Sequence, residues 1–232
     1  MVYNWLNINL FPARFTDCRL CSLPTDEASA LCSDCLADLP RNLHVCPRCG
    51  TGLANSVATA CGECQRNPPQ FDSAYIPYRY APPLIPFITG LKFHARLAEA
   101  RLLAELFLSS FPANTSPLPE CLIPVPLHPQ RLRERGYNQA LELARLLSQR
   151  LHLPIENQIV RRRLATRPQS ELSGDTRRRN MQQAFQLKAP VPYRHVALID
   201  DVVTTGSTVN ELARVLRQAG VEIIQVWAIA RA

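Results

Sequence analysis

The fold is decided by the stretch His195-Val-Ala-Leu-Ile-Asp200-Asp201-Val-Val-Thr204-Thr205-Gly206-Ser207-Thr208. Its four consecutive apolar residues, 196–199, are typical of a strand that is buried on both faces of a parallel sheet. After the Thr/Gly/Ser turn, apolar residues recur at helical spacing from Val209 until Gly220 ends the pattern. The sequence therefore predicts a strand, a loop and a helix in succession, which is the unit of an α/β fold.

The loop of this unit is suited to a phosphate group. Free backbone N–H groups and the positive end of the helix dipole converge where the helix begins. Asp200 and Asp201 precede the loop at the carboxyl end of the strand, where open α/β sheets bind ligands. The alternative is a solvated strand end with a helix cap. A buried strand that runs into two charges costs desolvation unless a ligand compensates for it, so we favour a binding site.

Length and composition bound the remaining choices. The 232 residues allow one large domain or a large and a small one, and 47% hydrophobic residues supply material for a core. No apolar run approaches the roughly 20 residues of a membrane-spanning helix. Asn4, Asn7 and Asn9 interrupt the apolar residues at the N-terminus, which also lacks a basic region and is a poor secretory signal. We therefore expect a cytoplasmic protein.

Eight of the nine cysteines form four evenly spaced Cys-x-x-Cys pairs, namely Cys18/Cys21, Cys32/Cys35, Cys46/Cys49 and Cys61/Cys64. Without a secretion signal, this pattern favours metal over disulfides. Two pairs complete a tetrahedral thiolate site, so the sequence predicts two structural Zn²⁺ ions. An iron–sulfur cluster or a redox dithiol is the alternative, and tandem and interleaved pairings both stay open.

A Pro-rich break at residues 67–70 follows the last cysteine pair. We predict a double zinc ribbon over residues 1–68 and an α/β domain over residues 69–232. Helices in right-handed crossovers should connect the strands of its parallel sheet. These strands are expected near Leu122–Val125, Ile159–Arg161, Val196–Asp200 and Ile223–Ala230.

Two basic segments carry the excess positive charge. Residues 131–179 contain 12 arginines and 5 acidic residues, an excess equal to the net charge of +7 of the whole chain. The first segment is predicted to be a loop suited to a polyanion, and it contains Arg131, Arg133, Arg135 and Gly136. The second, 161–180, is polar and is expected to be a mobile functional loop. A solvated loop is the alternative for the first segment, and arginines that bind nucleic-acid phosphates are the alternative for both.

The stretch 196–208 resembles the phosphoribosyl-diphosphate (PRPP) signature of type I phosphoribosyltransferases. The resemblance implies that the acidic pair holds the ribose hydroxyls and the loop amides hold the 5′-phosphate. The implied PRPP-binding residues are Asp200, Asp201, Val202, Val203, Thr204, Thr205, Gly206, Ser207 and Thr208. The loop at Arg131, Arg133, Arg135 and Gly136 is similar to the loop that binds the diphosphate in these enzymes.

A second resemblance concerns the segment 161–180. Thr166, Gln169 and Arg177 are spaced like the catalytic flexible loop of amidophosphoribosyltransferases, which closes over PRPP. The resemblance implies that these three residues act with Asp200 and Asp201 in catalysis.

Almost the whole chain resembles one family. It is similar to the ComF-type family of bacterial competence and DNA-utilisation proteins in six features. These are the cysteine pairs, Leu91-Lys92-Phe93, Pro124-Val-Pro126, Arg135-Gly136-Tyr137-Asn138, the Thr166/Gln169 loop and the acidic pair Asp200-Asp201. The resemblance implies a zinc-ribbon module fused to a type I phosphoribosyltransferase fold, a parallel sheet with helices on both faces. It also implies a link to the uptake or utilisation of external DNA.

The leading functional prediction is PRPP-dependent transfer of ribose 5-phosphate to an unknown acceptor, with Mg²⁺ on the released diphosphate. The alternative is a non-enzymatic adaptor that senses PRPP or a nucleotide. It would bind single-stranded DNA or a DNA-uptake protein through its zinc ribbons and arginines. No acceptor site or general base is recognisable in the sequence, which keeps this alternative open.

Overall fold

The computed structural model describes residues 17–25, 30–54, 59–112, 117–163 and 184–232. The predicted catalytic residues Thr166, Gln169 and Arg177 lie outside this described part. The chain forms two compact units, Met1–Leu39 and Pro40–Ala232. The first two cysteine pairs belong to the former unit and the last two pairs to the latter. The predicted division after residue 68 stays a prediction.

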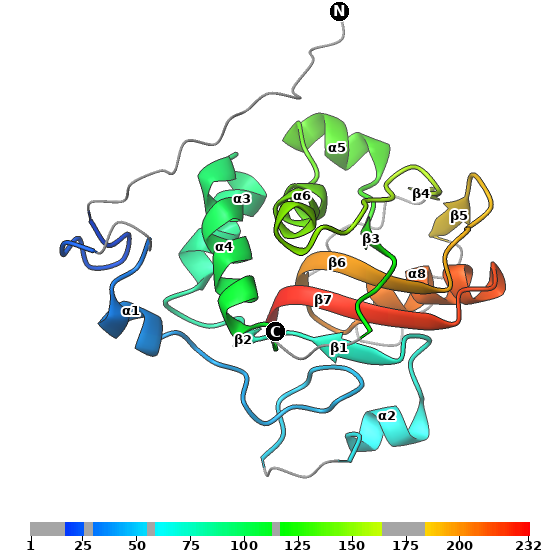
Figure 1. The fold of residues 1–232 in the computed structure, drawn as a ribbon, viewed down its shortest axis with the longest axis horizontal. Coiled ribbons are helices and arrows are strands. Elements are labelled where there is room, and N and C mark those ends of the chain that lie inside the picture. Colours follow the sequence, from blue (N-terminus) through cyan, green and yellow to red (C-terminus); the bar gives the residue numbers. More distant parts are fainter. Residues whose placement is uncertain (1–16, 26–29, 55–58, 113–116, 164–183) are drawn as a thin grey trace, which may run out of the picture. The chain divides into compact units, whose positions relative to one another are not determined.

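The core of the unit Pro40–Ala232 is a parallel sheet, as the sequence predicts, and it has five strands where the sequence located four (Figure 1). The strands are β1 (Ser73–Tyr75), β2 (Tyr78–Arg79), β3 (Cys121–Pro124), β6 (His195–Val203) and β7 (Ile223–Arg231). β6 lies between β3 and β7, while β1 and β2 both pair with the outer edge of β7. The side chains of 196–199 are buried, because a central parallel strand is covered on both faces.

Helices cover both faces of the sheet, and alternate residues of each strand separate the two layers. On one face, Trp227 of β7 packs against Phe107 of α4 (Leu97–Ser110), with ring centroids 5.8 Å apart. On the other, Val226 clusters with Leu212 and Leu216 of α8 (Ser207–Gln218).

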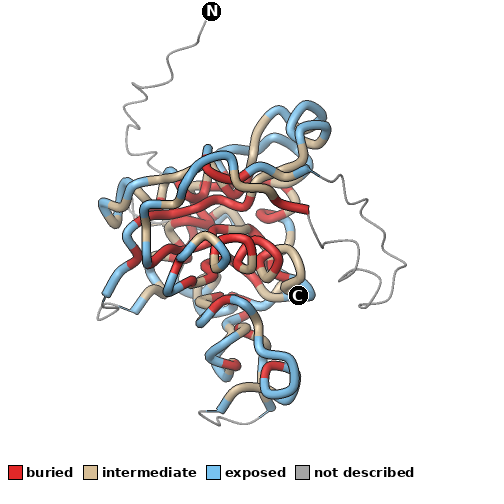
Figure 2. The backbone as a smooth tube through the Cα atoms, turned by 90° about the vertical axis from the view of Figure 1, so that its right-hand side faces the viewer, coloured by how far each residue is buried: buried red, intermediate tan, exposed pale blue. Residues whose placement is uncertain are grey.

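α3 (Ile85–Phe93) packs on α4, and α6 (Gln139–Leu151) lies against α4 and β6. Buried residues, red in Figure 2, gather in the interior of the α/β part and exposed residues surround them. In the described part of the chain, no helix has the length and apolar character needed to span a lipid bilayer.

One predicted strand belongs to a different sheet. β4 (Val160–Arg162) pairs antiparallel with β5 (Phe185–Leu187) instead of joining the parallel sheet. The reason is that the preceding residues occupy the free edge of β3. Leu122 of β3 donates its N–H to Pro154 O and accepts at its carbonyl from Glu156 N–H, both at 2.9 Å. The chain then leaves this edge before β4 begins.

The predicted first basic loop is instead a helix, α5 (Pro129–Arg135). The His128 side chain caps it by accepting from Gln130 N–H, and Pro129 provides the fixed φ that suits a first helical position. Gly136, with φ of 83°, ends it in the left-handed conformation. The three alternating arginines therefore project at helical angles and do not share one face.

Candidate functional site

The acidic pair lies inside strand β6, near its carboxyl end. The strand extends beyond its predicted end at Asp200 and ends at Val203. The Asp201 side chain is only 3% exposed and forms an ion pair with Lys92, whose Nζ lies 3.0 Å from Oδ2. Asp201 Oδ1 accepts from Val202 N–H, and Asp200 Oδ1 accepts from Asp201 N–H, both at 2.9 Å. The buried Asp201 carboxylate thus has a dedicated counter-charge from α3.

Among the described residues, no ion pair is formed by Asp200. Burial and, second, the neighbouring Asp201 carboxylate raise the pKa of Asp200 to about 8, against the opposing effect of Lys92. At neutral pH the Asp200 carboxyl therefore keeps its proton, as expected for a buried carboxyl group beside a second one. A ligand that offers a cation or hydroxyl donors would favour release of that proton.

Arginines from two further elements face the acidic pair. Burial lowers the pKa of Arg135 of α5, and the charge of Asp201 opposes this effect. Burial likewise lowers the pKa of Arg162 of β4, opposed by Asp200. Arg131 lies near enough to both guanidinium groups to lower their pKa further. Lys92 therefore pairs with Asp201, Arg135 and Arg162 lie within electrostatic range of the two carboxyl groups, and Arg131 lies near both arginines. These four cations outnumber the two carboxyl groups, which favours an anionic ligand.

The helical form of α5 separates the predicted diphosphate-binding residues. Arg131 and Arg135, four residues apart, lie on one face and are half-buried, whereas Arg133 lies on the opposite face and is exposed. The Arg135 guanidinium donates to Gln139 Oε1 at 2.6 Å and lies 5.5 Å from the ring centroid of Phe93. Gly136 is exposed and serves as the end of the helix.

The predicted phosphate loop follows the acidic pair directly. Thr204 and Thr205 are exposed, and Gly206, with φ of 76°, is the N-cap of α8. Thr205 Oγ1 accepts from Ser207 N–H at 3.3 Å. Gly206 provides no side-chain cap, so in the described part of the chain the first-turn amides that follow Ser207 are available to a ligand. A Cβ at Gly206 would meet only Val203 Cγ1 at 3.9 Å, so its backbone conformation, and not space, requires glycine.

Three consecutive residues of α3 join the parts of this site. The Leu91 carbonyl accepts from the Tyr137 hydroxyl, Lys92 pairs with Asp201, and Phe93 lies beneath Arg135. The segment 91–93 therefore ties the connection between α5 and α6 to the end of β6.

Sequence reasoning did not assign Lys92 or Arg162 to the site. Lys92 is one of only two lysines in the chain, which was the available signal. Arg162 is hidden among the consecutive arginines 161–163, of which only the central one is half-buried. Its placement depends on the β4–β5 pairing, which the sequence did not predict.

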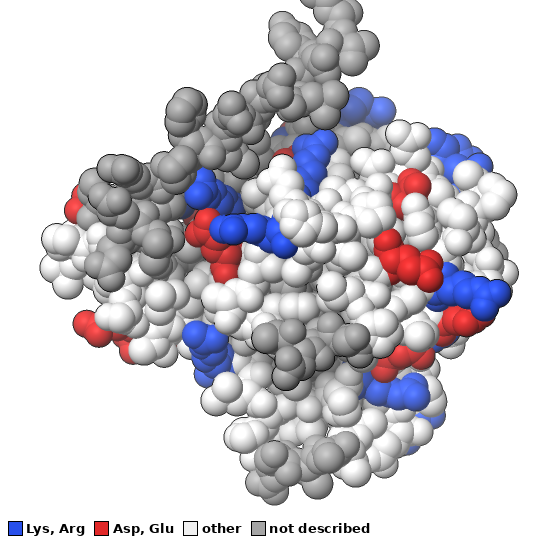
Figure 3. Space-filling view, in the orientation of Figure 1, with Lys and Arg blue, Asp and Glu red and all other residues white. Residues whose placement is uncertain are grey.

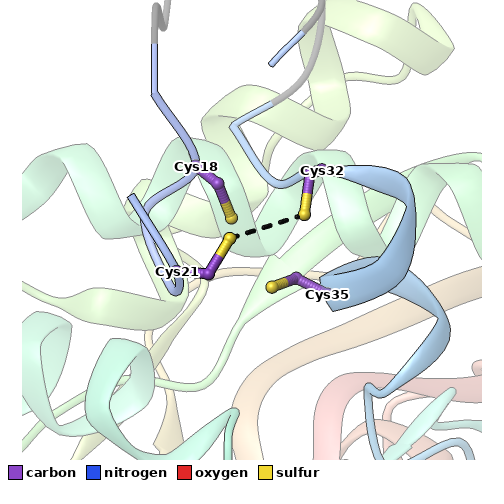
Figure 4. A group of neighbouring side chains, drawn as sticks. All are labelled: Cys18, Cys21, Cys32 and Cys35. Carbon is purple, nitrogen blue, oxygen red and sulfur yellow. Dashed lines mark hydrogen bonds between the residues drawn. The ribbon is translucent and has the colours of Figure 1, made fainter. Parts of the chain in front are cut away.

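The eight paired cysteines form two separate tandem clusters, which settles the pairing. One comprises Cys18, Cys21, Cys32 and Cys35, and the other comprises Cys46, Cys49, Cys61 and Cys64. In each cluster the four sulfur atoms lie within 4.8 Å of one another. Figure 4 shows the first four thiols turned toward a common centre, where Cys21 Sγ and Cys32 Sγ are 3.6 Å apart. Four convergent sulfurs fit a tetrahedral Zn²⁺ ion.

The two clusters repeat the same local structure. Each first pair lies in a turn closed by a β-bridge, Asp17 with Pro24 and Val45 with Gly52. Within each turn, the residue directly after the second cysteine has positive φ, 60° at Ser22 and 69° at Gly50. Each second pair opens a short helix, α1 (Ser33–Ala37) or α2 (Gly62–Arg66).

Backbone amides in both clusters point at sulfur. Burial disfavours the thiolates, but amide N–H groups lower the pKa of Cys18 to about 6 and that of Cys46 to about 7. Cys61 N–H donates to Cys46 Sγ at 3.2 Å and Leu20 N–H donates to Cys18 Sγ at 3.4 Å. Such donors stabilise metal-bound thiolates.

The comparisons with known proteins agree with both parts. Residues 7–65 match the double zinc ribbon domain, and residues 138–232 match the phosphoribosyl transferase domain. Competence protein F of Haemophilus influenzae is 43% identical over 88% of this chain and 91% of its own length. The chain belongs to the competence protein F family. DNA utilization protein YhgH of Escherichia coli is 37% identical over 92% of this chain and 96% of its own length.

A more distant member confirms how far the family extends. Competence protein ComFC of Streptococcus pneumoniae is 26% identical over 89% of this chain and 90% of its own length. The predicted ComF-type resemblance is therefore confirmed, as is the combination of zinc ribbon and phosphoribosyltransferase fold.

The tandem clusters predict a specific pattern of metal loss. Purified protein should contain about two Zn²⁺ per chain, and Cys21→Ser should remove about one, because three thiolates hold the ion much less well. Adding Cys32→Ser should remove no more, whereas adding Cys49→Ser should remove the second ion. Elemental analysis measures this, with Cys121→Ala as the control that keeps both ions. Loss of both ions in the Cys21/Cys32 variant would contradict the tandem arrangement.

The raised pKa of Asp200 predicts a stability change with a defined sign. Between about pH 4 and pH 8 the folded protein keeps a proton that the unfolded chain releases, so this group lowers stability as the pH rises. Asp200→Asn removes the effect and should be more stable than the parent at pH 8.5, with a smaller difference at pH 5. Urea unfolding at both pH values tests this, with Glu134→Gln as a surface-charge control. An equal difference at both pH values would contradict the assignment.

Proposed function

We propose that the protein binds PRPP at the carboxyl end of β6 and transfers its ribose 5-phosphate group to an acceptor, with release of diphosphate. The observation that carries the proposal is the ion pair of Lys92 with Asp201, with arginines of α5 and β4 within electrostatic range of the acidic pair and the loop that begins α8 beside it. Such a site offers acceptors for sugar hydroxyls, donors for one phosphate and cations for a second anion.

Each part of PRPP has a matching part of the site. The loop 204–208 would hold the 5′-phosphate through amides at the start of α8. Asp200 and Asp201 would accept hydrogen bonds from the ribose hydroxyls, and Lys92 would hold the Asp201 carboxylate in position. Arg131 and Arg135 would face the diphosphate. The predicted roles of Thr166, Gln169 and Arg177 fall on residues outside the described part and stay predictions.

The chemistry would depend on charge compensation. Breaking the bond between the anomeric carbon and the diphosphate develops positive charge on the sugar ring and negative charge on the leaving group. Arg131 and Arg135 would stabilise the leaving diphosphate, while the carboxylates fix the ring. Mg²⁺, for which the carboxylates and the diphosphate offer oxygen ligands, would neutralise part of the same charge.

The names of the relatives support a biological setting for the proposed activity. They refer to competence and to DNA utilization, and we propose that the present protein likewise serves the uptake or use of external DNA. Direct DNA binding would require an extended basic surface. On the face shown in Figure 3, the described Lys and Arg side chains are interspersed with Asp and Glu side chains. For the described arginines of α5 and β4, which lie within electrostatic range of the acidic pair, we therefore propose a role in the ligand site.

Charge removal at the acidic pair is the direct test of PRPP binding. The double variant Asp200→Asn, Asp201→Asn keeps the shape of both side chains, so the protein should fold while PRPP affinity falls. Each lost charge-assisted hydrogen bond is worth ~1.5–3 kcal/mol, which predicts roughly ten- to a hundredfold weaker binding per residue by calorimetry. Ribose 5-phosphate should weaken as well, whereas free diphosphate should not. Unchanged PRPP affinity would contradict the proposal.

The two faces of α5 offer a matched test of the arginines. Arg135→Ala should weaken diphosphate and PRPP binding, whereas Arg133→Ala removes the same charge from the exposed face and should have at most a small effect. Single-stranded DNA titrated against both variants at several salt concentrations tests the adaptor alternative. If the arginines bind DNA phosphates, DNA affinity should fall steeply with salt and both variants should flatten that slope. Equal effects of the two substitutions on diphosphate would contradict the face assignment.

A further inference from the structure

A chain of hydrogen bonds runs from the second cysteine cluster to the end of β6. Arg231, on β7, donates from Nη2 to Thr51 Oγ1 at 2.9 Å and from Nη1 to the Val203 carbonyl at 3.0 Å. Thr51 Oγ1 also lies 3.2 Å from Cys49 Sγ, a member of the cluster. One guanidinium therefore links two segments that are far apart in the sequence, the cysteine turn and the strand that carries the acidic pair.

At the end on β6, this series of hydrogen bonds reaches the residue directly before the phosphate loop. Val203 is the last residue of β6 and Thr204 begins the loop. The Val203 carbonyl accepts from both Arg231 Nη1 and Ala232 N–H, each at 3.0 Å. Its side chain is 4% exposed. Because the peptide before the loop is held in this way, Arg231 helps to set the position from which 204–208 begin.

At its other end, the series of hydrogen bonds reaches the cysteine turn, which packs closely against residues next to the sheet. Asn42 Nδ2 donates to the carbonyls of Gly50 and Ile76, at 2.9 and 3.1 Å. A Cβ at Gly50 would lie only 2.9 Å from Ile76 Cδ1, so the cysteine turn packs directly against the residue between β1 and β2. A change in the geometry of the turn would therefore reach the sheet and would not be absorbed by a loose connection.

We propose that Arg231 is a positioning residue through which metal binding at the second cluster orders the phosphate loop. The Thr51 hydroxyl can accept from Arg231 and donate its own proton to a metal-bound Cys49 thiolate. A metal ion that holds the Cys49 thiolate in place would fix the position of the Thr51 hydroxyl. The hydroxyl in turn fixes the Arg231 guanidinium, which holds the Val203 carbonyl. The consequence for ligand affinity rests on the proposed PRPP function, but the ordering of the loop does not.

Amide hydrogen exchange of residues 204–209 tests the ordering without any ligand. Cys64→Ser, which breaks the second cluster, should increase the exchange of these amides roughly tenfold, corresponding to loss of about 1.4 kcal/mol of local stability. Cys35→Ser, which breaks the first cluster in the other compact unit, should leave them unchanged. Equal acceleration by both substitutions would overturn the proposal.

Two substitutions test the link between the second cluster and the phosphate loop without removing a metal ligand. They therefore avoid unfolding that is caused by metal loss. Thr51→Val and Arg231→Met should keep two Zn²⁺ per chain and still speed exchange of the loop, and Thr51→Ser should restore the parent rate. Arg217→Met is the matched control. Arg217 also joins segments that are distant in the sequence, because it lies on α8 and donates to Gln70 and Asp72, but it lies at the end of α8 opposite to the loop. Unaltered loop exchange in both Thr51→Val and Arg231→Met would overturn the proposal.

Ligand binding gives the second readout. Thr51→Val and Arg231→Met should bind ribose 5-phosphate roughly three- to tenfold more weakly, since the net value of a hydrogen bond is about 0.5–1.5 kcal/mol. Free diphosphate, which faces α5, should bind as to the parent. If the parent binds neither PRPP nor ribose 5-phosphate, the proposed function fails, and the exchange measurements still decide whether the second cluster orders the loop.

Discussion

The structure depends on placing two carboxyl groups at the buried end of a central parallel strand. Such groups are costly to desolvate unless cations or donors compensate for them. Lys92 provides an ion pair for Asp201, while the raised pKa of Asp200 shows that compensation there is incomplete. α3, α5 and β4 each bring a cation to this point, so the packing of three separate elements serves one electrostatic requirement. A site kept in this state is poised for a ligand that completes its charge balance.

The cysteine clusters meet a different requirement. Segments of this length bury too little apolar surface to fold alone, and convergent thiolates that bind a metal can replace a core. The two clusters share their local structure but not their setting, since the second belongs to the same compact unit as the sheet. Its turn contacts the strands through Asn42, Gly50 and Arg231. The second cluster is thus in contact with the sheet that carries the proposed ligand site, in addition to holding its own segment together.

Membership of the competence protein F family joins these two requirements in one chain. Relatives 43% and 37% identical match it along most of their length, so the combination of ribbon and transferase fold is a property of whole proteins. The proposed support of the phosphate loop by the second cluster, through Arg231, would explain why the two parts occur together.

The sequence by itself determined the elements that depend on local pattern. A buried apolar run followed by charges specified β6, the helical period specified α8, and Cys-x-x-Cys spacing specified the metal ligands. Only the tertiary structure decided which cysteine pairs combine, that β4 leaves the parallel sheet, and that Lys92 and Arg162 join the site. The helical form of α5 likewise separated Arg133 from Arg131 and Arg135. These outcomes depend on contacts between residues distant in the chain, whose energies no local pattern records.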